Sequence, residues 1–279
     1  MTPHDHAAVD SFGQRLRWLA SDSLVMARRN LEHVRQIPEK LLDVTIQPLM
    51  FVLLFGFVFG GVIAIPDGSY REYLLGGVLV QSLAFGIVGP ATSIATDLRE
   101  GVVDRFRTLP GSRAAYLIGH VLAELASSSI AVVVLSLSGL LIGWGIHSDL
   151  GSAIGGYGVV LLFAFAMQWC GTLLGLYASR SPESAQGAVF IVIFPMTFLA
   201  STFVPLGGLS PVLREIASWN PISTLAAAVR TLFGNPTGMP DDPAWPLRHP
   251  VLAAVLWSLV LLAISMPLAM RRFRQITSA

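Results

Sequence analysis

Two titratable side chains, His120 and Glu124, lie one helical turn apart inside a long apolar stretch of the sequence. A histidine and a carboxylate at this spacing can share a proton or form an ion pair. Such groups in a membrane-spanning helix mark either a proton pathway or a polar contact between helices. Because this stretch is longer than a membrane requires, we expect Glu124 near the cytoplasmic interface. We predict a structural polar pair, with a proton relay as the alternative.

Three glutamines fall within or at the edge of other apolar stretches, namely Gln47, Gln81 and Gln168. An amide group needs a hydrogen-bond partner in hydrocarbon, because no water is available there. These side chains therefore predict either contacts to a transported molecule or hydrogen bonds between helices. We group them with Phe198, one of many phenylalanines in the apolar stretches, as candidates for lining a substrate path.

The sequence lacks the motifs of an enzyme. It contains no HExxH, no GxSxG and no phosphate-binding P-loop, and its only lysine, Lys40, lies in Pro-Glu-Lys-Leu. Cys170 is the only cysteine, which excludes a disulfide within the chain and a multi-cysteine metal site. We therefore expect no catalytic residue, no metal ligand and no cofactor bound by this chain. A serine hydrolase using 127–129 is a weaker alternative to helix packing by these serines.

The composition sets the fold class. Of 279 residues, 53% are hydrophobic and 13% are charged, whereas soluble domains carry about 25% charged residues. The formal net charge of +1 gives no indication of a nucleic-acid partner. About 20 apolar residues are needed to cross a bilayer. The sequence predicts an all-α integral membrane protein with six transmembrane helices, at about 44–65, 73–96, 114–145, 152–178, 184–204 and 251–270.

The segments between and around these spans are polar. We expect a disordered tail over 1–13, a basic amphipathic helix over 14–43 lying on an anionic leaflet, and a basic tail over 271–279. The region after the fifth span is too interrupted to cross the membrane. It predicts two short helices within 209–233, the second capped by Asn220 with a proline in its first position.

The basic residues predict the orientation. An even number of spans places both termini on one side of the membrane. Fourteen of the 18 Lys and Arg residues fall on that side, and four fall on the other, namely Arg71, Arg214, Arg230 and Arg248. Basic residues are enriched in cytoplasmic loops. We therefore expect both termini in the cytoplasm of a multi-pass protein of the cell membrane, and the short helices of 209–233 outside.

The most charged short stretch, Asp97–Arg113, joins the second and third spans. Its apolar residues share one helical face, and Asp97 with Glu100 has the spacing of a capping box. We predict an amphipathic helix over 97–110, ended by Pro110 and the glycine that follows. Because this helix would be connected directly to the second and third spans, a force applied to it would also move those spans. An ordinary loop on the lipid headgroups is the alternative.

Taken together, these features resemble the type-2 ABC exporter permeases, and most closely the daunorubicin-resistance-type permeases. The resemblance extends from about Arg28 onward. Its most specific pieces stand in a fixed order: Glu100-Gly101, Asp104-Arg105, Leu109-Pro110, Ser112-Arg113, Asn220-Pro221, and Arg230 with Gly234. The resemblance implies that 14–43 is an elbow helix, that 44–270 is the transmembrane domain and that 97–110 is a coupling helix. The implied ATPase contacts are Glu100, Gly101, Asp104, Arg105, Phe106 and Arg107.

The resemblance also implies partners. Two copies of a separate ATPase subunit would bind ATP and magnesium, and a second permease, identical or related, would complete the path within the lipid. The resemblance implies varied substrates, namely hydrophobic drugs, lipids, polysaccharides and glycolipids. The apolar, aromatic spans favour a hydrophobic drug or a lipid among them. Export of a polysaccharide or glycolipid, an ATP-independent carrier or channel, and a membrane-embedded enzyme or scaffold are the alternatives.

Overall fold

The computed structural model describes residues 38–59, 63, 65, 68–102, 113–178 and 181–278, without the side chains of 38–45, 47–48, 113–114 and 277–278. Within these residues the chain is helical, with no β-strand. The elements are α2 (Pro38–Val58), α3 (Tyr70–Phe85), α4 (Val88–Arg99), α6 (Arg113–Leu141), α7 (Leu150–Ala178), α8 (Pro182–Phe198), a 3-10 turn η1 (Leu206–Gly208), α9 (Pro211–Trp219), α10 (Pro221–Phe233), α11 (Trp245–Arg248) and α12 (Pro250–Ser278). The predicted tail 1–13 and most of the predicted helix 14–43 lie outside the described residues.

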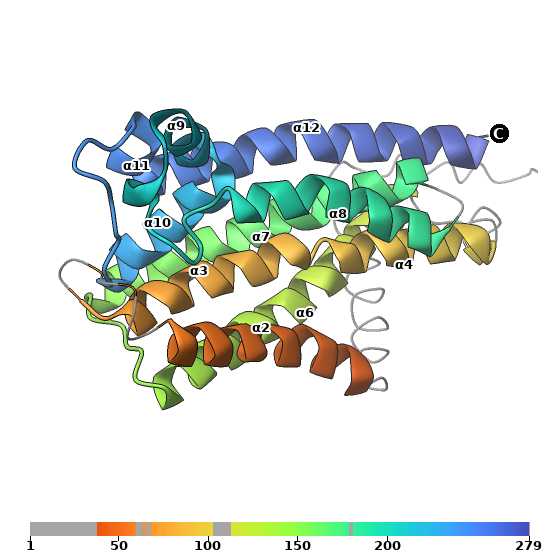
Figure 1. Cartoon of the computed structure of the whole chain (residues 1–279). Helices are drawn as coiled ribbons and strands as arrows, with labels where there is room; N and C mark the ends of the chain where they lie inside the picture. Colours follow the sequence, from red (N-terminus) through yellow and green to blue (C-terminus); the bar gives the residue numbers. More distant parts are fainter. Residues whose placement is uncertain are drawn as a thin grey trace, which may run out of the picture.

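The long helices lie side by side, and the short ones gather at one end (Figure 1). We call the end with α9, α10 and α11 the cap end, and the end where α4 and α12 finish the base end. Among the described residues, four helical stretches are long and apolar enough to cross a membrane: Tyr70–Arg99, Ala115–Leu141, Leu150–Ala178 and Pro250–Ile276. Helices α2 and α8 occupy the positions of the predicted first and fifth spans, and α8 has only 17 residues. The six-span count therefore stays a prediction.

The second predicted span is two helices rather than one. Helix α3 begins with a complete capping box formed by Ser69 and Glu72, and it ends at Gly86. Helix α4 starts at Val88, with Pro90, which has no amide N–H, in its first turn. Helix α3 packs against α2 and α10, whereas α4 packs against α7 and α8. The break thus separates a cap-end half from a base-end half of this span.

Glycines of α7 allow α4 to pack closely against it. A Cβ atom added to Gly171 would lie 2.5 Å from the carbonyl oxygen of Ile87, and one added to Gly175 would lie 2.3 Å from that of Ala91. Neither distance is possible for a real Cβ. These glycines have the GxxxG spacing that allows helix backbones to approach each other. Here that spacing joins two helices of the same chain.

The cap end is built around α10. The predicted cap is confirmed, because the Asn220 side chain accepts a hydrogen bond of 2.9 Å from the backbone N–H of Ile222, with Pro221 first in the helix. Gly234 ends α10 with a φ of 70°, a conformation that favours glycine. Next to it, Asn235 accepts a hydrogen bond of 2.9 Å from the indole N–H of Trp144 and so joins the α6–α7 loop to α10.

Candidate functional site

At the base end, α4 continues through Asp97 and finishes at Arg99. Gly101 follows with a φ of +67°, the left-handed conformation typical of helix ends. The predicted capping box of Asp97 and Glu100 is therefore wrong, because Asp97 lies in the last turn of a helix and not before its first. The span helix carries on past the apolar stretch, and the left-handed glycine stops it.

Asp97 instead joins α4 to the next long helix. Its carboxylate accepts a hydrogen bond from the phenol O–H of Tyr116 in α6. The Tyr116 ring in turn stacks on Phe273 of α12, with ring centroids 5.5 Å apart and planes inclined by 7°. The two flanks of segment 103–112 are thus joined to each other and to α12. We call this arrangement of Asp97, Tyr116 and Phe273 the base tie.

Of the predicted coupling residues, only Glu100 and Gly101 are among the described ones. Glu100 is exposed, and a Cβ atom added to Gly101 would meet no atom of the described residues within 4 Å. The other four, Asp104, Arg105, Phe106 and Arg107, lie outside the described residues.

The glutamines have different surroundings. Gln168 of α7 is buried, and its amide N–H donates a hydrogen bond of 2.7 Å to the hydroxyl of Ser128 in α6, as the interhelix alternative expects. The side-chain oxygens of Gln168 and Gln81 are buried without a hydrogen-bond partner among the described residues. Phe198, at the end of α8, is exposed and lies against Phe194. The side chain of Gln47 lies outside the described part of the structure.

His120 and Glu124 do not pair with each other in this structure. The His120 ring is buried and lies parallel to that of Tyr116, and its Nε2 atom has no hydrogen-bond partner among the described residues. The Glu124 carboxylate faces α4, where a Cβ atom added to Gly89 would lie 2.9 Å from it. The one-turn spacing brought the two residues to the same region of α6, but packing directs the side chains to different neighbours.

A buried arginine at the cap end was missed as a structural centre. The side chain of Arg230 in α10 is fully buried, and it donates hydrogen bonds to three backbone carbonyls: Tyr73 at 2.9 Å, Ser201 at 2.9 Å and Thr202 at 3.1 Å. Its guanidinium carbon lies 3.5 Å from the centroid of the Tyr73 ring. We call this set of contacts the arginine clamp. It joins α3, the segment after α8, and α10.

Small residues make room for the arginine clamp. A Cβ atom added to Gly77 would lie 2.0 Å from the Thr202 carbonyl oxygen, and one added to Gly76 would lie 2.9 Å from Arg230 itself. The Tyr73 hydroxyl donates a hydrogen bond of 2.7 Å to the Ser201 carbonyl. An arginine in an otherwise apolar helix was the signal available in the sequence, where Arg230 entered only as one of four basic residues expected outside and as part of a resemblance.

The described residues hold no group of three or more His, Cys, Asp and Glu side chains that could bind a metal ion. The two polar arrangements found here, the base tie and the arginine clamp, lie at opposite ends of the bundle. Both join helices and neither brings together a nucleophile, a base and a substrate cavity.

The sequence matches the ABC-2 type transporter family over residues 22–233. It is 32% identical to the daunorubicin resistance ABC transporter permease protein DrrB1 of Streptomyces coeruleorubidus, over 91% of this chain and 86% of that protein. It is 23% identical to the doxorubicin resistance ABC transporter permease protein DrrB of Mycobacterium tuberculosis, over 81% of this chain and 80% of that one. The putative transport permease ycf38 of Porphyra purpurea is 25% identical over 75% of this chain and 73% of that protein.

Proposed function

Because this chain belongs to the ABC-2 type transporter family, and so is a membrane permease subunit of an ABC exporter, we propose that it exports a hydrophobic drug or lipid-like molecule. The substrate class is supported by the names of relatives that refer to daunorubicin and doxorubicin resistance, and by the apolar helices of this chain. The energy comes from a separate ATPase subunit, which binds ATP and magnesium. Two copies of it act on two permeases, identical or related.

The observation that carries the mechanism is the base tie. The part of the predicted segment 97–110 that follows α4 acts as the coupling helix, and its ATPase contacts are Glu100, Gly101 and the four residues 104–107. The hydrogen bond between Asp97 and Tyr116 joins the two flanks of this segment, so a push on it reaches α4 and α6 together. The stacking of Tyr116 on Phe273 extends the movement to α12.

The cap end provides the fixed point of this movement. The arginine clamp holds α3 against α10, whereas α4 begins after the break at Gly86 and packs on other helices. A break between two helical segments is a natural hinge, because the local hydrogen-bond ladder is already interrupted. We propose that α4 swings about this break when the ATPase closes, while α3 stays with the cap. Opening of a path toward the outside follows as a rocking of the helices.

This proposal includes a topology. The six predicted spans are α2, α3 with α4, α6, α7, α8 and α12; the base end faces the cytoplasm, as do both termini and the elbow helix over 14–43. Helices α9 and α10 then lie outside. Apart from the four stretches that are long enough to cross, the support is the excess of basic residues on the side assigned to the cytoplasm.

A tyrosine substitution tests the coupling role. Tyr116→Phe removes the hydrogen bond to Asp97 and keeps the stacked ring. A hydrogen bond to a charged group contributes about 1.5–3 kcal/mol, so we expect a loss of about 10- to 100-fold in substrate exported per ATP hydrolysed. The reconstituted permease–ATPase complex should keep its ATPase rate.

The matched control is Tyr157→Phe, which removes a hydrogen bond of 3.0 Å to Ser136 that joins α6 and α7 away from the base tie. Equal loss of coupling in both variants would contradict the proposal.

A second measurement tests the topology, using Phe106→Cys in a Cys170→Ser background and a membrane-impermeant thiol reagent. Reaction from the outside of sealed cells would rule out a cytoplasmic coupling helix.

A further inference from the structure

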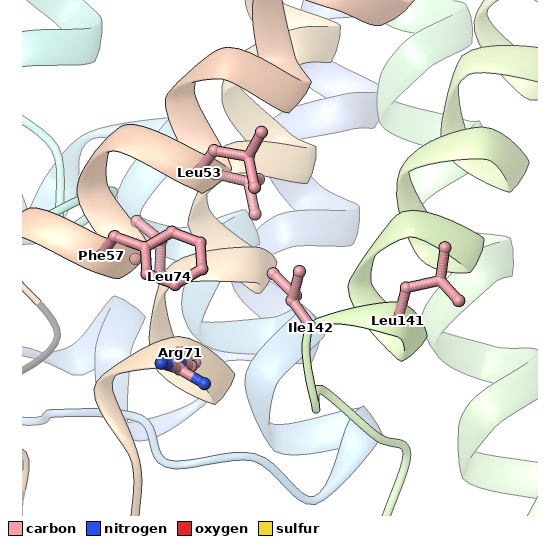
Figure 2. A pocket seen from close by; sticks show the side chains of 8 residues that line it. Leu53, Phe57, Arg71, Leu74, Leu141 and Ile142 are labelled. Carbon is pink, nitrogen blue, oxygen red and sulfur yellow. The ribbon is translucent and has the colours of Figure 1, made fainter.

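A cavity of about 210 Å³ lies near the cap end, between α2, α3 and the end of α6. In Figure 2, Phe57, Leu74 and Ile142 lie near one another, Arg71 lies to one side of them, and Leu141 points away at the edge. The cavity is lined by Val52, Leu53, Gly56, Phe57, Arg71, Leu74, Leu141 and Ile142. Among the described residues that line it, the arginine is the only charged one. This cavity is separate from the base tie and from the arginine clamp.

Arg71 differs from the other arginines of the cap end in having no hydrogen-bond acceptor in the part of the chain that the structure describes. Among the described residues, Arg214 donates to the carbonyls of Gly207 and Leu209, and Arg248 is paired with the Asp242 carboxylate. Arg230 donates to three carbonyls, as described above. Arg71 has only the face of the Phe57 ring, 5.5 Å from its guanidinium carbon. A guanidinium carries five N–H donors, so the donors of Arg71 are available to a ligand.

The shape of the cavity limits what can bind. Drug-sized ligands occupy pockets of about 300–1,000 Å³, so this cavity is too small to enclose one. Its edges are open, because Leu141 is 88% exposed and Phe57 is 71% exposed. The flanking residues of α2 and α6 that point outward are also apolar, including Leu54, Leu137 and Leu140. A ligand with a small polar end and a long apolar chain fits such a cavity, with the chain continuing along the exposed helix faces.

We propose that this cavity binds an anionic phospholipid of the outer leaflet, with its phosphate on Arg71 and its acyl chains along α2 and α6. Arginine binds phosphate through two parallel N–H donors, and an anion also balances its charge. A cationic amphiphile is disfavoured at this position by the same charge. The assignment to the outer leaflet rests on the proposed orientation of the chain, in which the cap end is external.

The test measures lipid preference in the assembled permease–ATPase complex. A fluorophore is attached at Leu137→Cys, one turn from the cavity, in a Cys170→Ser background. Quenching by acyl-brominated phosphatidylglycerol and by acyl-brominated phosphatidylcholine in nanodiscs gives the relative association constant of the two lipids. We expect the wild-type chain to prefer phosphatidylglycerol, and Arg71→Gln to lower that preference about fivefold, the factor for one basic residue near an anionic surface.

Three further variants make the result specific. Arg71→Lys should keep part of the preference, because it keeps the charge. Gly56→Leu should lower the preference with the arginine in place, because a Cβ atom at Gly56 meets only Leu74, at 3.7 Å, and the larger side chain fills the cavity. Arg248→Gln removes the same charge from the cap end and should change nothing. An unchanged ATPase rate reports that each variant is folded.

The proposal is overturned if the wild-type chain shows no preference, if Arg71→Gln and Arg248→Gln have equal effects, or if Gly56→Leu keeps the full preference. None of these results depends on transport of a substrate. The lipid site and the export function can therefore fail separately.

Discussion

Replacing Arg230 by methionine is expected to be the most damaging single change at the cap end. Methionine is unbranched and of comparable length, but it donates no hydrogen bond. The change removes three hydrogen bonds from a charged donor, each contributing about 1.5–3 kcal/mol, and leaves the carbonyls of Tyr73 and Thr202 without this partner. Relief from burying a charge offsets several kcal/mol of this loss. We expect a net destabilisation of about 3–5 kcal/mol, the range for removing one partner from a buried charged contact.

The assay is equilibrium unfolding of the purified permease in detergent, followed by tryptophan fluorescence. Trp144 is a suitable reporter of the cap, because its ring lies edge-on to Phe233 of α10 with centroids 5.6 Å apart. Arg230→Lys should be intermediate, since an ammonium keeps the charge but cannot match the fork of a guanidinium. Arg248→Met is the control: it removes an exposed ion pair, which contributes about 0–1 kcal/mol. An Arg230→Met chain within about 1 kcal/mol of the wild type would refute the clamp as a structural centre.

Two further outcomes are expected. Gly175→Leu should abolish or strongly reduce folded permease in detergent chromatography, because its Cβ atom would lie 2.3 Å from the Ala91 carbonyl, whereas Gly158→Leu on the same helix meets nothing within 4 Å and should be tolerated. Hydrogen bonds from the Ser152 side chain and backbone lower the pKa of the Asp149 carboxyl. The ionised carboxylate therefore stabilises the folded chain at pH values above its unfolded pKa of about 3.9. This stabilisation is lost as the pH falls through the lower pKa of the folded state. Asp149→Ala should therefore lower the Tm equally at about pH 6 and about pH 8, and less at about pH 3; a difference between the two higher values would contradict this.

Much of the helical pattern could be predicted, because hydrophobic runs and breakers act locally. The predicted fourth span, 152–178, lies within Leu150–Ala178, and the predicted cap at Asn220 is present. Such features depend on residues within a few positions of one another. The predicted capping box of Asp97 and Glu100 is also a local pattern, but it was wrong. Helix α4 continues through Asp97 to Arg99, so Asp97 lies inside a helix and cannot cap the start of another.

The contacts that join distant segments could not be predicted. The three acceptors of Arg230 are backbone carbonyls, which every residue has, so no sequence pattern marks them. The partner of Asp97 is a tyrosine across the segment that joins two spans, and its choice depends on how α4 and α6 meet. His120 and Glu124 were predicted to pair because they lie one turn apart on α6. Their side chains instead contact Tyr116 and the region of Gly89 in α4, which the spacing along α6 could not predict.

The arginine clamp also imposes an order on biosynthesis. Arg230 and Tyr73 are separated by 157 positions, so the ribosome completes α3 long before it makes the side chain that fills the space beside it. Until then, the glycine-lined slot in α3 has no occupant from α10. A chain released before residue 230 is expected to be cut readily by protease at the cap end, whereas a chain ending after Gly234 should resist. The stability of the first third of the protein is thus expected to depend on a side chain from the last third.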